Sequence, residues 1–126
     1  PIAADYKSGT FESSKPGISG FDTFLPLMLQ IAESRKITLS RLIEAATSAP
    51  VKAMGVEGGN LSINSKADIC VFDPDLIWVA DEENYKSLGQ NSPLFGKTLK
   101  GKVTQTLING NIVYDYQGPQ KSTSLL

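Results

Sequence analysis

The hydrophobic and polar positions follow two different periods in the two halves of the chain. Before residue 60, apolar residues recur at helical spacing and predict one helix over about residues 22–35 and another that begins after Thr38. After residue 60, the pattern changes to short apolar runs that are typical of strands. We therefore expect a helical front half and a sheet-forming back half. The helical positions are Phe24, Leu25, Met28, Leu29 and Ala32 in the first group and Leu39, Leu42, Ile43 and Ala46 in the second.

Polar residues and prolines predict where these helices begin and end. Asp22 or Thr23 can cap the first helix, and Thr38 can cap the second, because their side-chain oxygens accept hydrogen bonds from free backbone N–H groups. Pro50 can end the second helix or open a short further turn through Met54.

The strongest strand signal is the run from Ala67 to Pro74. Its central block, ICVF at 69–72, is apolar on both faces and predicts a strand that is covered on both sides. Asp73-Pro74 predicts a turn that closes this strand, and Leu76–Val79 predicts another strand behind it. The single cysteine, Cys70, is then expected to be a small core residue.

A second strand signal is the segment from Val103 to Tyr114. Two β-rich runs, 103–108 and 112–114, flank Asn109-Gly110, and this dipeptide between such runs predicts a hairpin. We expect these strands and the run at 67–74 to form one small sheet.

Composition excludes several classes of function. The chain has 126 residues, 40% of them apolar and 20% charged, with a net charge of −1, which is typical of one globular domain or of two incomplete pieces. Lys and Arg form no cluster, so we expect no nucleic-acid partner. The sequence has neither an apolar run of membrane-spanning length nor a leader pattern at its first residues, so we expect no membrane partner and a cytoplasmic location.

Candidate chemistry is sparse, because the chain contains no histidine. Histidine is the commonest general base and a preferred zinc ligand, so no Ser-His-Asp or Cys-His arrangement is possible within these residues. The acidic triplet at 81–83 is interpreted as a solvated face, and no glycine-rich phosphate motif occurs. From the residues alone, we predict an α+β piece without a self-contained active site.

Three segments in fixed order resemble the C-terminal third of a dihydroorotase of the amidohydrolase superfamily. They read PGISGFDT at 16–23, LSINSKADICVFDP at 61–74, and NSPLFG at 91–96 followed by INGNIVY at 108–114. The middle segment alone would indicate only the wider superfamily, including allantoinase-like and hydantoinase-like enzymes. The other two favour dihydroorotase. Asn64 stands where the family usually has glycine, and Asn also tolerates a positive φ.

The resemblance implies an α+β fragment of a larger fold. It would comprise the last helices of a (β/α)8 metal-dependent hydrolase barrel and the C-terminal strands of its small β-sandwich domain. Residues 1–21 would be the remnant of a substrate loop, 22–58 the barrel helices, 59–116 the sandwich portion, and 117–126 a flexible tail.

The resemblance also implies the chemistry. A dihydroorotase reversibly interconverts N-carbamoyl-L-aspartate and dihydroorotate in de novo pyrimidine biosynthesis, with zinc as cofactor. The family's zinc ligands and catalytic residues lie upstream of the matching region, so this chain would hold none of them and would be inactive by itself. The only substrate-binding residues that the resemblance implies are Pro16 and Gly17. The alternative for these two residues is a plain turn into the helix.

The implied partners are the N-terminal barrel segment, further copies of the same protein in a homo-oligomer, and aspartate carbamoyltransferase. Three alternatives stay open at the level of sequence. The chain could belong to a non-catalytic dihydroorotase-like scaffold for aspartate carbamoyltransferase, to an allantoinase- or hydantoinase-type enzyme, or to a stand-alone helix–sheet module with exposed apolar faces.

Overall fold

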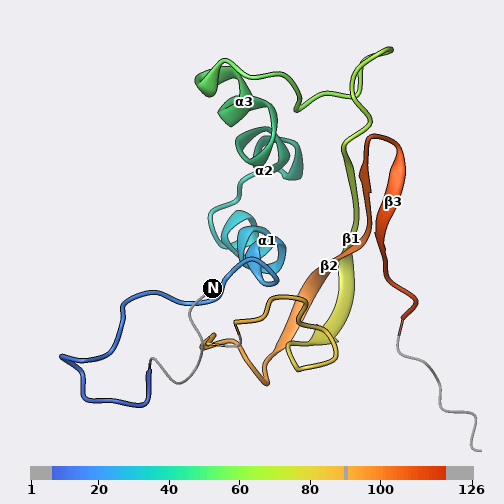
Figure 1. The fold of residues 1–126 in the computed structure, drawn as a ribbon. Coiled ribbons are helices and arrows are strands. Elements are labelled where there is room, and N and C mark those ends of the chain that lie inside the picture. Colours follow the sequence, from blue (N-terminus) through green and yellow to red (C-terminus); the bar gives the residue numbers. More distant parts are fainter. Residues whose placement is uncertain (1–6, 90, 119–126) are drawn as a thin grey trace, which may run out of the picture.

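A computed structural model describes residues 7–89 and 91–118 and places a group of helices beside a small antiparallel sheet (Figure 1). The predicted division into a helical front half and a sheet-forming back half is confirmed. Residues 1–6 of the predicted loop and 119–126 of the predicted tail lie outside the described residues. The elements are α1 (Phe24–Ser34), α2 (Leu39–Ala46), α3 (Ser48–Met54), β1 (Ile69–Val79), β2 (Thr98–Ile108) and β3 (Asn111–Asp115).

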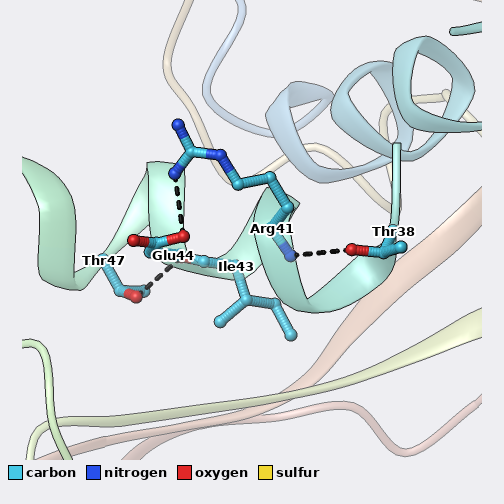
Figure 2. A network of polar contacts seen from close by, with 5 residues as sticks. All are labelled: Thr38, Arg41, Ile43, Glu44 and Thr47. Atoms are coloured by element: carbon cyan, nitrogen blue, oxygen red, sulfur yellow. Dashed lines mark hydrogen bonds and ion pairs between the residues drawn. The ribbon is translucent and has the colours of Figure 1, made fainter. Parts of the chain in front are cut away.

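The start of α2 shows how the sequence specifies a helix locally. Thr38 Oγ1 accepts a hydrogen bond from Arg41 N at 3.3 Å, which confirms the predicted cap (Figure 2). Arg41 Nη1 pairs with Glu44 Oε2 at 2.8 Å, one turn along the same face, and Thr47 Oγ1 donates to Ile43 O at the end of the helix. Pro50 lies in the first turn of α3, where proline is tolerated, so it belongs to a further helix rather than only ending α2.

The start of α1 differs from the sequence prediction. Thr23 occupies the N-cap position, but its side chain caps no helical N–H, and its hydroxyl donates to Gly20 O at 3.4 Å. Asp22 is engaged elsewhere, because its Oδ1 accepts from the backbone N–H of Lys86 at 2.8 Å. Both candidate caps therefore hold the preceding loop instead of the helix end.

The sheet has the strand order β1-β2-β3 with antiparallel pairing throughout. The predicted hairpin is confirmed, since Asn109 and Gly110 both have positive φ values, 51° and 77°, as a type I′ turn requires. β2 begins at Thr98, earlier than the sequence predicted. Asn64 has a φ of 67°, so the asparagine does adopt the left-handed conformation there.

The prediction that a turn at Asp73-Pro74 ends the strand is wrong. β1 continues through it, and the register with β2 shifts between Asp73 and Ile77. Pro74 lacks an N–H, and it lies in this irregular stretch, where no ladder hydrogen bond is needed. Asp73 Oδ1 accepts from the backbone N–H groups of Asp75 and Leu76 at 2.8 and 3.2 Å, so the turn signal acts as a local bend inside one strand.

The predicted cover on both faces of 69–72 is also wrong. Val71 is 44% exposed, and Cys70 is exposed rather than a core residue. The helices lie to one side of the sheet (Figure 1), and within residues 7–89 and 91–118 no second layer covers its other face. The core lies at the opposite end of β1 and consists of Trp78, Ala80 and Tyr85, with Leu76 and Leu99 packed against it.

A glycine lets α1 approach the sheet near this core. Gly101 on β2 has a φ of 93°, and a Cβ there would overlap the side chain of Leu29 on α1. The Gly101 carbonyl accepts from Trp78 Nε1 at 2.9 Å, so the same residue fixes the indole ring. In the part of the chain that the structure describes, no helix has the length and apolarity needed to cross a membrane.

Candidate functional site

The loop over residues 16–22 is held against a segment more than sixty positions away. The side-chain amide of Asn91 donates to Gly17 O at 3.2 Å, and the Asn91 carbonyl accepts from Ser19 N at 2.7 Å. These contacts join the PGISGFDT and NSPLFG segments, which the sequence analysis had placed only in order along the chain. Their junction defines the candidate site.

Pro16 and Gly17, the predicted substrate-binding residues, both lie at the surface of this loop. Gly17 has a φ of 104°, which side chains rarely permit, and without a Cβ its backbone can be approached closely by another molecule. Their contact with a substrate stays a prediction. The structure shows that the loop around them is hydrogen-bonded to Asn91, and the alternative of a plain turn into α1 stays open.

The other end of the loop is anchored where it meets α1. Asp22 Oδ1 accepts from Lys86 N at 2.8 Å, which joins the loop to the turn after β1. Thr23 is almost fully buried at 1% exposure, and its hydroxyl bond to Gly20 O closes the last turn of the loop. The loop is thus tied at Gly17, Ser19 and Asp22.

A buried cation lies behind this loop. Lys102 on β2 is 5% exposed, and its Nζ donates to Asn84 Oδ1 at 2.8 Å. The same Nζ lies 3.8 Å from the centroid of the Trp78 ring and 4.8 Å from that of Tyr116. Burial lowers the pKa of Lys102 to about 8, although the nearby carboxylates of Asp81 and Asp22 act in the opposite direction.

Sequence reasoning missed Lys102, because a lysine between glycine and valine at the start of a β-rich run is usually solvated. The only local signal is the GKV sequence itself, in which glycine leaves room beside the strand. The partners of the ammonium group come from residues 78, 84 and 116, which no local pattern connects to it.

The acidic triplet at 81–83 is part of a turn. Asp81 Oδ1 accepts from both N and Nδ2 of Asn84, at 3.1 and 2.8 Å, and these hydrogen bonds lower the pKa of Asp81. Within residues 7–89 and 91–118, no three His, Cys, Asp or Glu side chains group so that they could hold a metal ion. Since the whole chain also lacks histidine, these residues do not fit the zinc site that the resemblance implies.

A cavity of about 1020 Å³ separates the helices from the sheet, and residues of all six elements line it. About half of these residues are apolar, and the polar ones include Asp22, Asn84, Lys86 and Lys102. Protein interiors are close-packed, so a space of this size between two layers is where further polypeptide would be expected to pack.

Among the described residues, three buried polar atoms lack partners, and one of them belongs to Asp22, which lines this cavity. Ser19 Oγ, Asp22 Oδ2 and Tyr85 Oη are buried and have no hydrogen-bond partner within the described part of the chain. Buried polar groups in proteins are almost always paired. We expect water or polypeptide outside the described residues to supply these partners.

Comparisons with known proteins show what this chain is similar to. A sequence model of the amidohydrolase family matches residues 17–113. The chain is 42% identical over 114 residues to a dihydroorotase from Syntrophus aciditrophicus (strain SB), covering 90% of this chain and 27% of that protein. It is 44% identical over 103 residues to a dihydroorotase from Aquifex aeolicus (strain VF5), covering 82% of this chain and 24% of that protein.

A solved structure shows a similar fold. The L-hydantoinase (dihydropyrimidinase) from Arthrobacter aurescens matches with a TM-score of 0.72 and 29% sequence identity, over 82% of this chain and 24% of that one. The chain thus spans about a quarter of the length of the proteins it matches.

Proposed function

This chain belongs to the amidohydrolase family, and from that premise we propose that it is the C-terminal part of a dihydroorotase. The reaction of such an enzyme is the reversible interconversion of N-carbamoyl-L-aspartate and dihydroorotate in de novo pyrimidine biosynthesis. The resemblance to dihydroorotases that the sequence predicted is confirmed by two relatives of that name at 42% and 44% identity.

The relatives named dihydroorotase favour that enzyme over other amidohydrolases, and one structural observation supports a joint role for its two characteristic segments. The two segments that distinguish it in the sequence, at 16–23 and 91–96, meet in space through Gly17, Ser19 and Asn91. Segments that act together at one site are expected to be adjacent in the fold, even when they lie far apart in the chain. This junction therefore supports a shared role at the substrate loop.

The proposed division of labour follows from the side chains present. These residues do not fit a zinc site, so we assign zinc and the catalytic side chains to polypeptide upstream of this chain. This chain's own contribution is to bind and orient: the loop backbone at Pro16 and Gly17 would lie against the substrate and help to exclude water. By itself the chain would be inactive.

The proposed architecture rests on the uncovered apolar surface. The cavity between helices and sheet supports packing of residues 22–58 as the last helices of a (β/α)8 barrel. Exposed apolar side chains on the sheet support residues 59–116 as part of a β-sandwich completed by strands from elsewhere. Ile77, Ile112 and Val113 are examples, at 70%, 56% and 57% exposure.

A hydantoinase-type cyclic amidohydrolase is the second candidate. The match to an L-hydantoinase structure at 29% identity favours it, because both enzyme types share this fold. A scaffold role beside aspartate carbamoyltransferase is a further proposal that the same experiment addresses, and homo-oligomerisation stays a prediction.

The test is an assay of the complete protein encoded by the reading frame that contains this chain. Purified with zinc, it should hydrolyse dihydroorotate with a kcat/KM about 100-fold above that for hydantoin or allantoin. The 126-residue chain alone should show no turnover. Preference for hydantoin would support the second candidate, and a folded, zinc-loaded protein that binds aspartate carbamoyltransferase without turnover would support the scaffold.

A further inference from the structure

We propose that Lys102 is a positioning residue for the substrate loop over residues 16–22. Through Asn84, it fixes the 81–86 turn, whose Lys86 backbone N–H anchors the loop at Asp22. The role of that loop in binding rests on the proposed function, whereas the connection itself rests on the contacts alone. Three steps link the ammonium group to the loop, and a fourth concerns its charge.

The first step is the position of the ammonium group. Lys102 Nζ lies against the rings of Trp78 and Tyr116, which belong to β1 and to the segment after β3. The Trp78 ring is itself held by its Nε1 hydrogen bond to Gly101 O, one residue before Lys102. The cation therefore lies against a fixed aromatic surface and points in a defined direction.

The second step is the contact between Lys102 and the turn. Nζ donates to Asn84 Oδ1 at 2.8 Å, while Asn84 Nδ2 and N both donate to Asp81 Oδ1. The amide of Asn84 is thus oriented from both sides. Without the ammonium group, Asn84 Oδ1 would lose this partner and the turn would lose its side-chain hydrogen bond to β2.

The third step leads from the turn to the loop. Two residues after Asn84, the backbone N–H of Lys86 donates to Asp22 Oδ1 at 2.8 Å. Asp22 lies between the 16–21 segment and α1. A shift of the turn would therefore change the position of Asp22, where the loop meets the helix. The Asn91 contacts with Gly17 and Ser19 complete the attachment from the same connection.

The fourth step concerns charge. The charged groups that act on Lys102 are Asp81 and Asp22, which favour the ammonium, and Lys86, which disfavours it. Burial outweighs them and lowers the pKa of Lys102 to about 8. The rings of Trp78 and Tyr116 and the amide of Asn84 offset part of the cost of burying this cation. Its contacts with the turn give a reason for a lysine at this position.

The experiment uses the complete protein and three substitutions. Lys102→Met keeps the alkyl chain and removes the charge, Lys102→Arg keeps a cation, and Lys100→Met is the matched control on the same strand. Lys100 is exposed and pairs with Asp75 at 2.8 Å, away from the turn. Two readouts are compared: steady-state kinetics with dihydroorotate, and hydrogen exchange of the Lys86 and Ser19 amides.

Lys102→Met should raise KM about tenfold and change kcat less than about twofold, because the loop binds substrate without taking part in the chemistry. It should speed exchange of the Lys86 and Ser19 amides about tenfold. Lys102→Arg should return both readouts to within about threefold of the unsubstituted protein. Lys100→Met should leave both readouts unchanged.

Unchanged KM and exchange in Lys102→Met would overturn the proposal, and so would an arginine variant as impaired as the methionine variant. If Lys102→Met does not fold, Asn84→Ser breaks the same hydrogen bond at the turn and should show the same two changes. Exchange needs no substrate. If the complete protein fails to act on dihydroorotate, the proposed function fails, and exchange still decides whether Lys102 holds the loop.

Discussion

The two ends of the β1–β2 ladder differ in how they are covered. At the packed end, Trp78 and Tyr85 are buried, and Lys102 lies among their neighbours. At the open end, Val71 and Ile108 remain partly exposed, and Ile112 on β3 is more exposed still. One sheet thus has an end where its own chain covers one face, with Ile77 on the other face 70% exposed, and an end where, among the described residues, the strands lack such a core.

The difference arises from the connections that leave each end. After β1 the chain folds back over Trp78: Ala80 N donates to Lys97 O at 2.9 Å, and Gly96 N donates to Ala80 O at 2.7 Å. The connection that reaches the open end leaves Leu61 and Ile63 exposed instead. The candidate loop is attached to the packed end through Lys86 and Asn91. The residues that hold this part of the site therefore belong to the described part of this chain.

The largest expected effect tests the packed end. Trp78→Ala should lower the free energy of unfolding by about 3–5 kcal/mol, because it empties a core position and removes the hydrogen bond to Gly101 O. Ile77→Ala, one position earlier and 70% exposed, should cost less than about 1 kcal/mol in this chain. Denaturant unfolding measures both, and equal costs would contradict the description of this end as the core.

An intermediate effect tests the open end. Val113→Thr keeps the side-chain shape and replaces a methyl group with a hydroxyl, which costs about 1–3 kcal/mol where the residue is buried without a partner. In the 126-residue chain, where Val113 is 57% exposed, the cost should be less than about 0.5 kcal/mol. In the complete protein it should reach the higher range. Equal small costs in both, measured by thermal unfolding, would show that nothing covers this end.

The smallest effect distinguishes two lysines on the same strand. Lys102 should titrate near its pKa of about 8, and Lys100 above its ordinary value of 10.5, because the Asp75 carboxylate raises the pKa of Lys100. NMR of lysine-labelled protein measures both directly. Similar titration of the two lysines would contradict the burial of Lys102.

The lowered pKa of Lys102 and the raised pKa of Lys100 determine how the stability of the folded state depends on pH. Between about pH 8 and 10.5 the unfolded state binds more protons than the folded state at Lys102, so this residue makes stability rise with pH in that window. The Lys100–Asp75 ion pair stabilises the folded state at lower pH. This stabilisation is lost as the pH rises through the raised pKa of Lys100.

The features that could be predicted from the sequence depend on local chemistry. The Thr38 cap and the Asn109-Gly110 turn each involve only a few neighbouring residues, and the structure has both. The failures concern burial and pairing. Asp73-Pro74 has a turn signal, but pairing with β2 keeps β1 continuous, and Cys70 lies in an apolar run without a covering layer.

The candidate site could also be predicted only in part from the sequence. Pro16 and Gly17 were identified through resemblance, and their contact with a substrate stays a prediction. The attachment of their loop to Asn91 and Lys86 joins residues 74 and 64 positions apart, which no spacing pattern reveals. Lys102 has a charge that usually indicates solvent, and only the folded arrangement shows that aromatic rings and an amide surround it.

The most direct test of the central claim, that the loop at the packed end binds the substrate of a dihydroorotase, is kinetics of Gly17→Ala in the complete protein. A Cβ at a φ of 104° should strain and crowd the loop, and kcat/KM for dihydroorotate should fall about 10- to 100-fold. Gly20→Ala is the matched control, since a Cβ there meets nothing within 4 Å, and it should stay within about twofold. Equal activity of the two variants would contradict the claim.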